Sequence, residues 1–184
     1  MPKKSPIVYA VDSKKVFLLF RLRLPALLVG LVLGLGISFL TSRFEDVLAH
    51  DIRTAFFLPF IVYLADAIGT QTEAIYVRDL KSGRARFHEY LAKESLLGLI
   101  FGLIFGAASA VVAWYWLADQ PLALSVGLAT MISATLAPPT ALIISQTIFH
   151  FHQDPAAESG PIATVVQDMI SVVVYGIVCS IILL

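Results

Sequence analysis

Three carboxylates lie within or close to long apolar stretches of this sequence: Asp66, Glu73 and Asp168. An Asp in the middle of a membrane helix costs about 2.5–3.5 kcal/mol on insertion scales, so such residues persist where they face a cavity, a partner or an ion. The chain after residue 93 contains no Lys or Arg that could neutralise Asp168. These acids are therefore the first candidates for chemistry.

Hydroxyl side chains accompany Asp168 at helical spacing. Thr164, Asp168, Ser171 and Tyr175 follow one another at intervals of four, three and four residues. Such intervals bring side chains to one face of a helix. We expect Asp168 and Thr164 to bind a metal ion, and Ser171 and Tyr175 to line a pore. The alternative is an Asp that is protonated or hydrogen-bonded between helices for packing alone.

A second stripe contains Asp66, Thr70 and Glu73, at intervals of four and three residues. We expect Asp66 to bind a metal ion and Thr70 and Glu73 to line the pore. Glu73 is equally compatible with a salt bridge to Arg78 or with an interfacial position. Gly69 permits local distortion, which would free backbone carbonyls for a cation.

The donor chemistry favours a hard cation. Carboxylates, hydroxyls, carbonyls and water suit Mg²⁺, which keeps several waters and takes one or two carboxylates from protein. Softer metals prefer thiolate and imidazole clusters, whereas Cys179 is the single cysteine and lies in an apolar run that predicts burial. The four histidines lack metal-binding spacing.

Composition decides the class of protein. Of 184 residues, 58% are hydrophobic and 14% are charged, and the mean hydropathy is +0.85. Soluble domains carry about 25% charged residues, and a soluble globule would expose too large an apolar patch. Soluble, nucleic-acid-binding and disordered classes are therefore excluded, and the chain is predicted to be an integral membrane protein.

The apolar runs are long and continuous, unlike the alternating strands of a membrane barrel. We therefore expect an all-α protein with five transmembrane helices. Their predicted ranges are residues 24–40 (with a start as early as 16), 55–77, 96–118, 121–149 and 161–184. We expect residues 1–19 to form a short basic N-terminal segment and residues 20–184 to form one transmembrane domain.

Charge predicts the orientation of these helices. The first 93 residues hold all 13 Lys and Arg, mostly in the N-terminal segment and in the loop after the second helix. Because cytoplasmic loops are enriched in Lys and Arg, we expect a cytoplasmic N-terminus, an external C-terminus and a location in the cell membrane.

Small residues and prolines mark helix contacts and breaks. Gly30 and Gly34 form one GxxxG motif, and Gly98, Gly102 and Gly106 form a doubled one. Such motifs let helix backbones approach closely, although glycine is also simply common in membrane helices. Two adjacent prolines, Pro138-Pro139, predict a kink or break in the fourth helix.

Two stretches resemble signatures of the MgtE magnesium transport family. The stretch LPFIVYLADAIGTQTEAIYVRDL is similar to a pattern with a proline, a GGNxGTQS-like turn and a VRxL ending. The stretch DPAAESGPIATVVQDMISVVVYG is similar to DPAxxSGPxxTTxxDxxxxxxY. The order and spacing of both stretches agree with the family over residues 20–184. The matching residues of the first stretch are Pro59, Gly69, Thr70, Gln71, Thr72, Val77, Arg78 and Leu80, and those of the second are Asp154, Pro155, Ala156, Ser159, Gly160, Pro161, Thr164, Asp168 and Tyr175.

The resemblance implies a homodimer in the lipid bilayer, with one ion pathway between protomers that the second and fifth helices line. The family's pathway acid falls on Asp168, so two copies would hold a largely hydrated Mg²⁺, as bound and transported ion. Ala67, Gly69 and Gln71 would line the same pathway. Ala65-Asp66-Ala67 stands where the family has GGN, which exchanges an amide for a carboxylate one position earlier. The resemblance covers the transmembrane domain without the family's cytoplasmic regulatory modules, so we expect the ion site itself or a separate regulatory protein to limit flux.

Divalent cation transport is thus the leading hypothesis, and two alternatives stay open. Asp66 and Asp168 could alternate between a divalent ion and a proton or Na⁺, which would make the protein a coupled exchanger. A purely structural membrane subunit is less favoured. An enzyme is not expected, because neither the GxGD motif of intramembrane aspartyl proteases nor the DGxxAR pattern of lipid transferases occurs.

Overall fold

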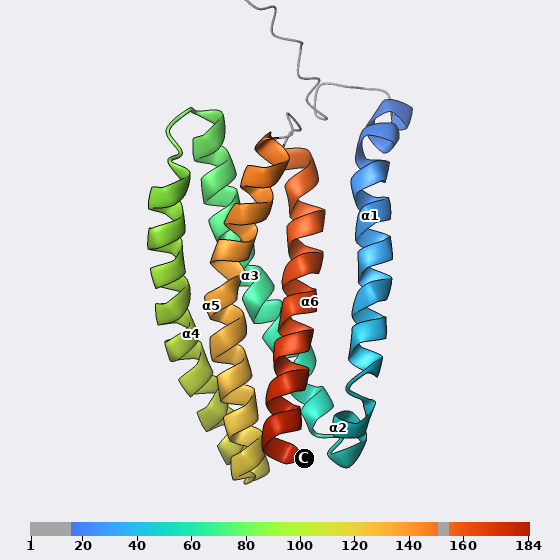
Figure 1. Ribbon diagram of the computed structural model, residues 1–184, viewed down its shortest axis with the longest axis vertical. Coiled ribbons are helices and arrows are strands. Elements are labelled where there is room, and N and C mark those ends of the chain that lie inside the picture. Colours follow the sequence, from blue (N-terminus) through green and yellow to red (C-terminus); the bar gives the residue numbers. More distant parts are fainter. Residues whose placement is uncertain (1–15, 151–154) are drawn as a thin grey trace, which may run out of the picture.

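The computed structural model describes residues 16–150 and 155–184, and these ranges fold into helices joined by short connections (Figure 1). The helices are α1 (Val16–Ser42), α2 (Glu45–His50), α3 (Thr54–Lys81), α4 (Phe87–Leu117), α5 (Gln120–His150) and α6 (Pro155–Leu183). Four of them, α3 to α6, are each long and apolar enough to cross a membrane. The two halves of α1, Val16–Pro25 and Leu27–Ser42, are bent by 41° and make a fifth span when they are counted together. The prediction of an all-α membrane protein is confirmed.

The helix boundaries differ from the sequence expectation at several ends. The third span begins at Phe87 rather than Leu96, and the fifth begins at Pro155 rather than Pro161. The short helix α2 was not expected in the first loop. Most of the predicted N-terminal segment, and Asp154 of the second signature, lie outside the described residues.

The arrangement places α5 at the centre of the bundle. It packs against α3, α4 and α6, while α3 also packs against α6. In Figure 1, α3 crosses behind α5 and α6, α4 forms one edge, and α1 stands at the other edge against α6. The two helices that carry the candidate acids, α3 and α6, are therefore direct neighbours.

The doubled glycine motif forms the contact between α4 and α5. Each glycine of α4 faces a backbone carbonyl of α5 closely enough that no side chain would fit between them. A methyl group added at Gly98, Gly102 or Gly106 would lie 3.0, 2.5 or 2.8 Å from the carbonyl oxygen of Thr135, Met131 or Gly127, respectively. By contrast, a methyl group at Gly30 or Gly34 of α1 would meet no atom within 4 Å. An interface is thus confirmed for the motif of α4, within one chain, and the motif of α1 has no packing role there.

The double proline does not break α5. The helix runs without interruption from Gln120 to His150, and Pro138 is fully buried. Pro139 cannot donate a hydrogen bond to the carbonyl of Thr135, which instead lies close to Gly98 of α4. The carbonyl that lacks the N–H of Pro139 is thus packed closely against α4. The expected break in α5 is not found.

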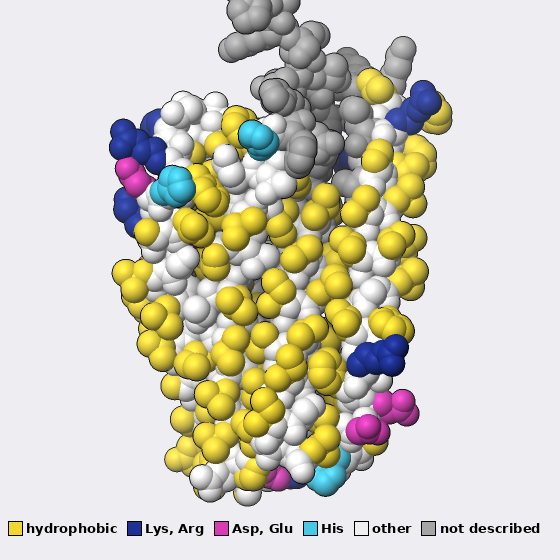
Figure 2. Space-filling view, viewed as in Figure 1, with side chains coloured by type: hydrophobic (Ala, Val, Ile, Leu, Met, Phe, Trp, Pro, Cys, Tyr) yellow, Lys and Arg dark blue, Asp and Glu magenta, His cyan; other side chains and the backbone are white. Residues whose placement is uncertain are grey.

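The surface follows the expectation for a membrane domain. Apolar side chains cover the middle of the molecule, and charged side chains gather near its two ends (Figure 2). The start of α1 and the connection between α3 and α4 lie at the same end, while α2 and the C-terminus lie at the other (Figure 1). Arg21 and Arg23 at the start of α1 are thus on the same side as the basic connection, as a cytoplasmic assignment of both requires. Which side that is remains a prediction.

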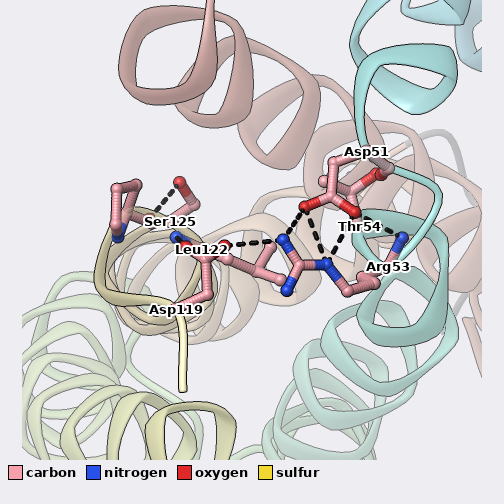
Figure 3. Close-up of polar contacts among 7 residues, drawn as sticks. Asp51, Arg53, Thr54, Asp119, Leu122 and Ser125 are labelled. Atoms are coloured by element: carbon pink, nitrogen blue, oxygen red, sulfur yellow. Dashed lines mark hydrogen bonds and ion pairs between the residues drawn. The ribbon is translucent and has the colours of Figure 1, made fainter. Parts of the chain in front are cut away.

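An arginine ties two connections together at the end opposite the basic segments (Figure 3). Arg53 donates to both carboxylate oxygens of Asp51, at 2.6–3.0 Å, and to Asp119 Oδ2 at 2.6 Å. Asp119 Oδ1 accepts the backbone N–H of Leu122 at 3.0 Å and so caps α5. This clamp joins the start of α3 to the turn between α4 and α5. The hydrogen bonds from Arg53 hold the pKa of Asp51 below its ordinary value.

We predict that Gly102→Ala lowers the thermal stability of the purified protein, whereas Gly30→Ala does not. The added methyl group at position 102 would collide with the carbonyl oxygen of Met131, and overpacking of this kind costs about 1–3 kcal/mol. Position 30 is open, and alanine is the better helix former. Melting temperatures in detergent, followed by tryptophan fluorescence, test the pair. Equal melting temperatures for the two variants would contradict this packing.

We also predict that Arg53→Gln lowers the melting temperature at pH 7 and that the difference from wild type shrinks as the pH falls below about 4. Because the pKa of Asp51 is depressed in the folded protein, the stabilisation is present above the unfolded value and disappears as the pH falls through the folded one. Arg43→Gln is the control, because the contact of Arg43 is the ring of Phe39 and not an acid. A difference that persists unchanged at pH 3 would rule out the clamp as its source.

Candidate functional site

The contact between α3 and α6 is built from polar and small side chains. The two helices run in opposite directions, and the Ser159 hydroxyl at the start of α6 donates to the carboxylate of Glu73 near the end of α3. At the middle of the contact, the amide of Gln167 lies directly on Gly69. These two contacts fix the alignment of the helices.

Gly69 leaves the space that the Gln167 amide occupies. A methyl group at this position would lie 1.5 Å from Gln167 Oε1, so a larger residue would displace the end of the glutamine side chain. Gly69 was expected to line a pore, and in this chain it is buried beneath Gln167. Gln167 was not among the residues predicted from the sequence. Its position beside Asp168 in an otherwise apolar helix is the feature that could have indicated it.

The predicted acids come together across this contact. Because Gln167 lies on Gly69 and the two helices are antiparallel, Asp66 and Asp168 lie within about one helical turn of each other in depth. The Oδ1 atom of Asp66 is buried and has no hydrogen-bond partner, although the residue as a whole is only partly buried. Within the described residues, no three His, Cys, Asp or Glu side chains form a cluster that could hold a metal ion. The donors of one chain thus amount to two neighbouring carboxylates, which suit a hydrated ion better than a dehydrated one.

A groove of about 430 Å³ opens between α3 and α6 on the side of the basic connection. It brings together three predicted residues, Thr70, Glu73 and Thr164. Because Asp66 and Asp168 each lie one helical turn farther along from Thr70 and Thr164, the groove leads towards the two acids. The complete lining is Thr70, Glu73, Ala74, Val77, Arg78, Lys81, Gly160 and Thr164.

The environment of Glu73 settles one alternative left open by the sequence. Its side chain is 8% exposed and accepts the hydrogen bond from Ser159. Arg78 pairs with Asp79, at 3.0 Å from Nε to Oδ1. Glu73 is therefore linked to α6 by a hydroxyl, and the ion pair of Arg78 involves a different acid.

The polar face predicted for α6 is divided in two. Thr164 and Asp168 are partly exposed, whereas Ser171 and Tyr175 are buried. The Tyr175 hydroxyl donates to the carbonyl oxygen of Thr54 at 2.7 Å, which secures the far end of α6 against α3. The division arises because a row of residues four apart winds around the helix axis. The buried row consists of Ser159, Ala163, Gln167, Ser171, Tyr175 and Cys179, each at most 2% exposed.

The remaining predicted residues lie on the outer face of α3. Thr70 and Gln71 are exposed, and Ala67 is partly buried. Within the described residues, polar side chains thus reach the surface of the bundle in the same segment of α3 that carries the acids. Whether they line a pore remains a prediction.

Other residues of the first signature hold α3 in place. The Thr72 hydroxyl donates to Glu94 Oε2 of α4 at 2.8 Å. Tyr76 donates to the side-chain oxygen of Gln146 on α5. Glu94 was not predicted as a contact of α3, because Glu94 precedes the expected start of the third helix at Leu96.

An apolar pocket lies elsewhere in the bundle and is not a candidate site for a cation. It occupies about 480 Å³ between α3 and α4, and it lacks charged residues. Its lining is Phe56, Phe57, Phe60, Leu64, Phe105, Ala108, Ser109, Val112 and Trp116.

Comparisons with known proteins identify the family of this chain. Residues 58–178 match the sequence model of the MgtE family, which is described as a divalent cation transporter. The chain is similar to the magnesium transporter MgtE of Enterococcus faecalis, with 30% identity over 161 residues that cover 86% of this chain and 36% of that protein. It is also similar to the magnesium transporter MgtE of Bacillus subtilis, with 28% identity over 173 residues that cover 89% and 37% of the two chains. The chain thus spans little more than a third of the length of these relatives. Because the family model matches well over half of the chain, this protein belongs to the MgtE family.

Proposed function

We propose that the protein carries divalent cations, Mg²⁺ in the first place, across the cell membrane. The observation that carries the proposal is the position of Asp66 and Asp168, each one helical turn beyond a residue, Thr70 or Thr164, that lines the groove between α3 and α6. Membership of the MgtE family and the names of both relatives support the same ion.

In this proposal Asp168 is the main ligand, and Asp66 and Thr164 assist it. The carboxylates attract the ion and hold it through its water shell, while the Thr164 hydroxyl offers an uncharged oxygen. Contact through water keeps binding weak enough for the ion to leave, as conduction requires. The groove beside Thr70 and Glu73 is the approach from the basic end of the molecule.

We further propose that two copies enclose the pathway. In support, Thr70 and Gln71 are exposed on a membrane-spanning helix, where polar side chains avoid lipid. A second copy covering this face would bring two Asp168 side chains towards a common axis. In this proposal the N-terminus is cytoplasmic and the C-terminus is external, as the distribution of Lys and Arg predicts. A separate regulatory protein could act on the cytoplasmic side.

Coupled exchange is the second candidate function. Asp66 and Asp168 feel each other's charge, so a proton or Na⁺ on one carboxylate would weaken the binding of a divalent ion at the other. Uptake that follows an imposed proton or Na⁺ gradient would favour this mechanism over a passive pathway.

We predict that Asp168→Asn abolishes Mg²⁺ uptake into liposomes loaded with a Mg²⁺-sensitive dye, in the absence of pH or Na⁺ gradients. The amide removes the charge that attracts the ion but keeps the shape of the side chain. Asp46→Asn is the matched control, because Asp46 is exposed and lies on α2, away from the groove. We expect Asp46→Asn to transport like wild type.

The result has two informative failures. Uptake by Asp168→Asn at the wild-type rate would contradict the assigned pathway acid. A correctly folded wild type without uptake would exclude a passive pathway and shift the proposal to exchange.

A further inference from the structure

Buried oxygen atoms at the contact between α3 and α6 lack hydrogen-bond partners. Three buried oxygen atoms have no hydrogen-bond partner there: Asp66 Oδ1, Gln167 Oε1 and Ser171 Oγ. Gln167 and Ser171 are 2% and 1% exposed. Buried polar atoms are normally satisfied, because each orphan costs about 1–3 kcal/mol. Three orphans on two facing helices therefore indicate a bound group.

The register of the helices places the three residues within about one helical turn of one another in depth. Gln167 Oε1 lies against Gly69, which fixes one level of the contact. Asp66 precedes Gly69 by three residues and Ser171 follows Gln167 by four. Because α3 and α6 run in opposite directions, both steps lead the same way, by about 4.5 and 6 Å along the axes. Asp66 and Ser171 therefore lie at the same depth, about one turn from the Gln167 amide.

The amide of Gln167 is oriented by its other end. Its Nε2 donates to the carbonyl oxygen of Ala163 at 3.1 Å, within α6. The oxygen is thereby directed away from that carbonyl and towards α3. A carboxylate oxygen, an amide oxygen and a hydroxyl are all available as acceptors at this place.

We propose that these three oxygens bind one dehydrated Na⁺ ion inside each protomer, at a site that excludes Asp168 and shares Asp66 with the pathway for the divalent ion. All three are oxygen donors, which suit a hard cation. One carboxylate gives the site a single negative charge, which a monovalent ion neutralises in a low-dielectric interior. Mg²⁺ sheds its waters reluctantly, so direct binding by buried oxygens favours a monovalent ion.

The proposed Na⁺ site would regulate the proposed transport of divalent ions. Na⁺ binding itself does not depend on that transport. Sodium at Asp66 Oδ1 would cancel the charge that Asp66 exerts on Asp168. Binding of Na⁺ would thus weaken the attraction of the pathway for a divalent ion. This link requires the proposed transport, whereas Na⁺ binding itself does not.

The test is equilibrium binding of ²²Na⁺ to the purified full chain in detergent, with choline as the replacement cation. We expect saturable binding to wild type. Ser171→Ala and Gln167→Leu each remove one ligand, and each should raise the Kd about tenfold or more. Size-exclusion chromatography and circular dichroism establish folding, and Ser171→Ala decides the question if Gln167→Leu does not fold.

Ser145→Ala is the matched control. Ser145 also has a fully buried hydroxyl without a partner. It adjoins Gln146, which bonds to Tyr76, and Tyr76 lies ten residues, or about 15 Å, from Asp66 along α3. We expect its Na⁺ binding to match that of wild type. Wild type without saturable binding, or with binding that neither site variant weakens, would overturn the proposal and leave buried water as the occupant.

Asp168→Asn separates this inference from the proposed function. It should keep Na⁺ binding within about threefold of wild type, because Asp168 supplies none of the three oxygens. Loss of Na⁺ binding in this variant would contradict the assignment of the Na⁺ ion to Asp66, Gln167 and Ser171 without Asp168. Failure of wild type to transport Mg²⁺ would contradict the proposed function but leave a measured Na⁺ site intact.

Discussion

The hydrocarbon surroundings oblige each polar group of this bundle to find its partner within the protein. Three hydrogen bonds from one segment of α3 follow from this constraint. Thr72 bonds to Glu94 of α4, Glu73 to Ser159 of α6, and Tyr76 to Gln146 of α5. One segment of α3 is thereby tied to every neighbour that it meets. Its position, and with it the position of Asp66, depends on these bonds.

The exceptions to this rule are informative because satisfied groups surround them. Five hydroxyls of α5 bond back to the carbonyl four residues earlier, as Thr130 does to Val126 at 2.7 Å, whereas Ser133 and Ser145 of the same helix do not. The oxygens of Asp66 and Gln167 have no such solution. An orphan oxygen beside a carboxylate is costly in lipid, so selection for stability alone would remove it. The cost is reasonable where an ion supplies the missing partner.

The sequence predicts the parts of this structure that depend on hydropathy and charge. The spans, the presence of Asp66 and Asp168 within them and the burial of Cys179 all follow from residue type and spacing. The contact of Gln167 with Gly69 could not be predicted, because it depends on the register between two helices far apart in the chain. The division of the α6 face depends on which neighbours cover its lower half. The helix α2 was missed because six residues are too few for a periodic signal.

Two kinds of packing divide the bundle into a scaffold and a site. Between α4 and α5, glycines meet backbone carbonyls and side chains so closely that an added methyl group would displace them. Between α3 and α6, one glycine meets a polar side chain, and oxygens remain available beside it. A substitution in the first contact should therefore change stability without changing what binds. A substitution in the second alters the donors themselves, so the same class of residue, glycine, has a structural role on α4 and shapes a binding site on α3.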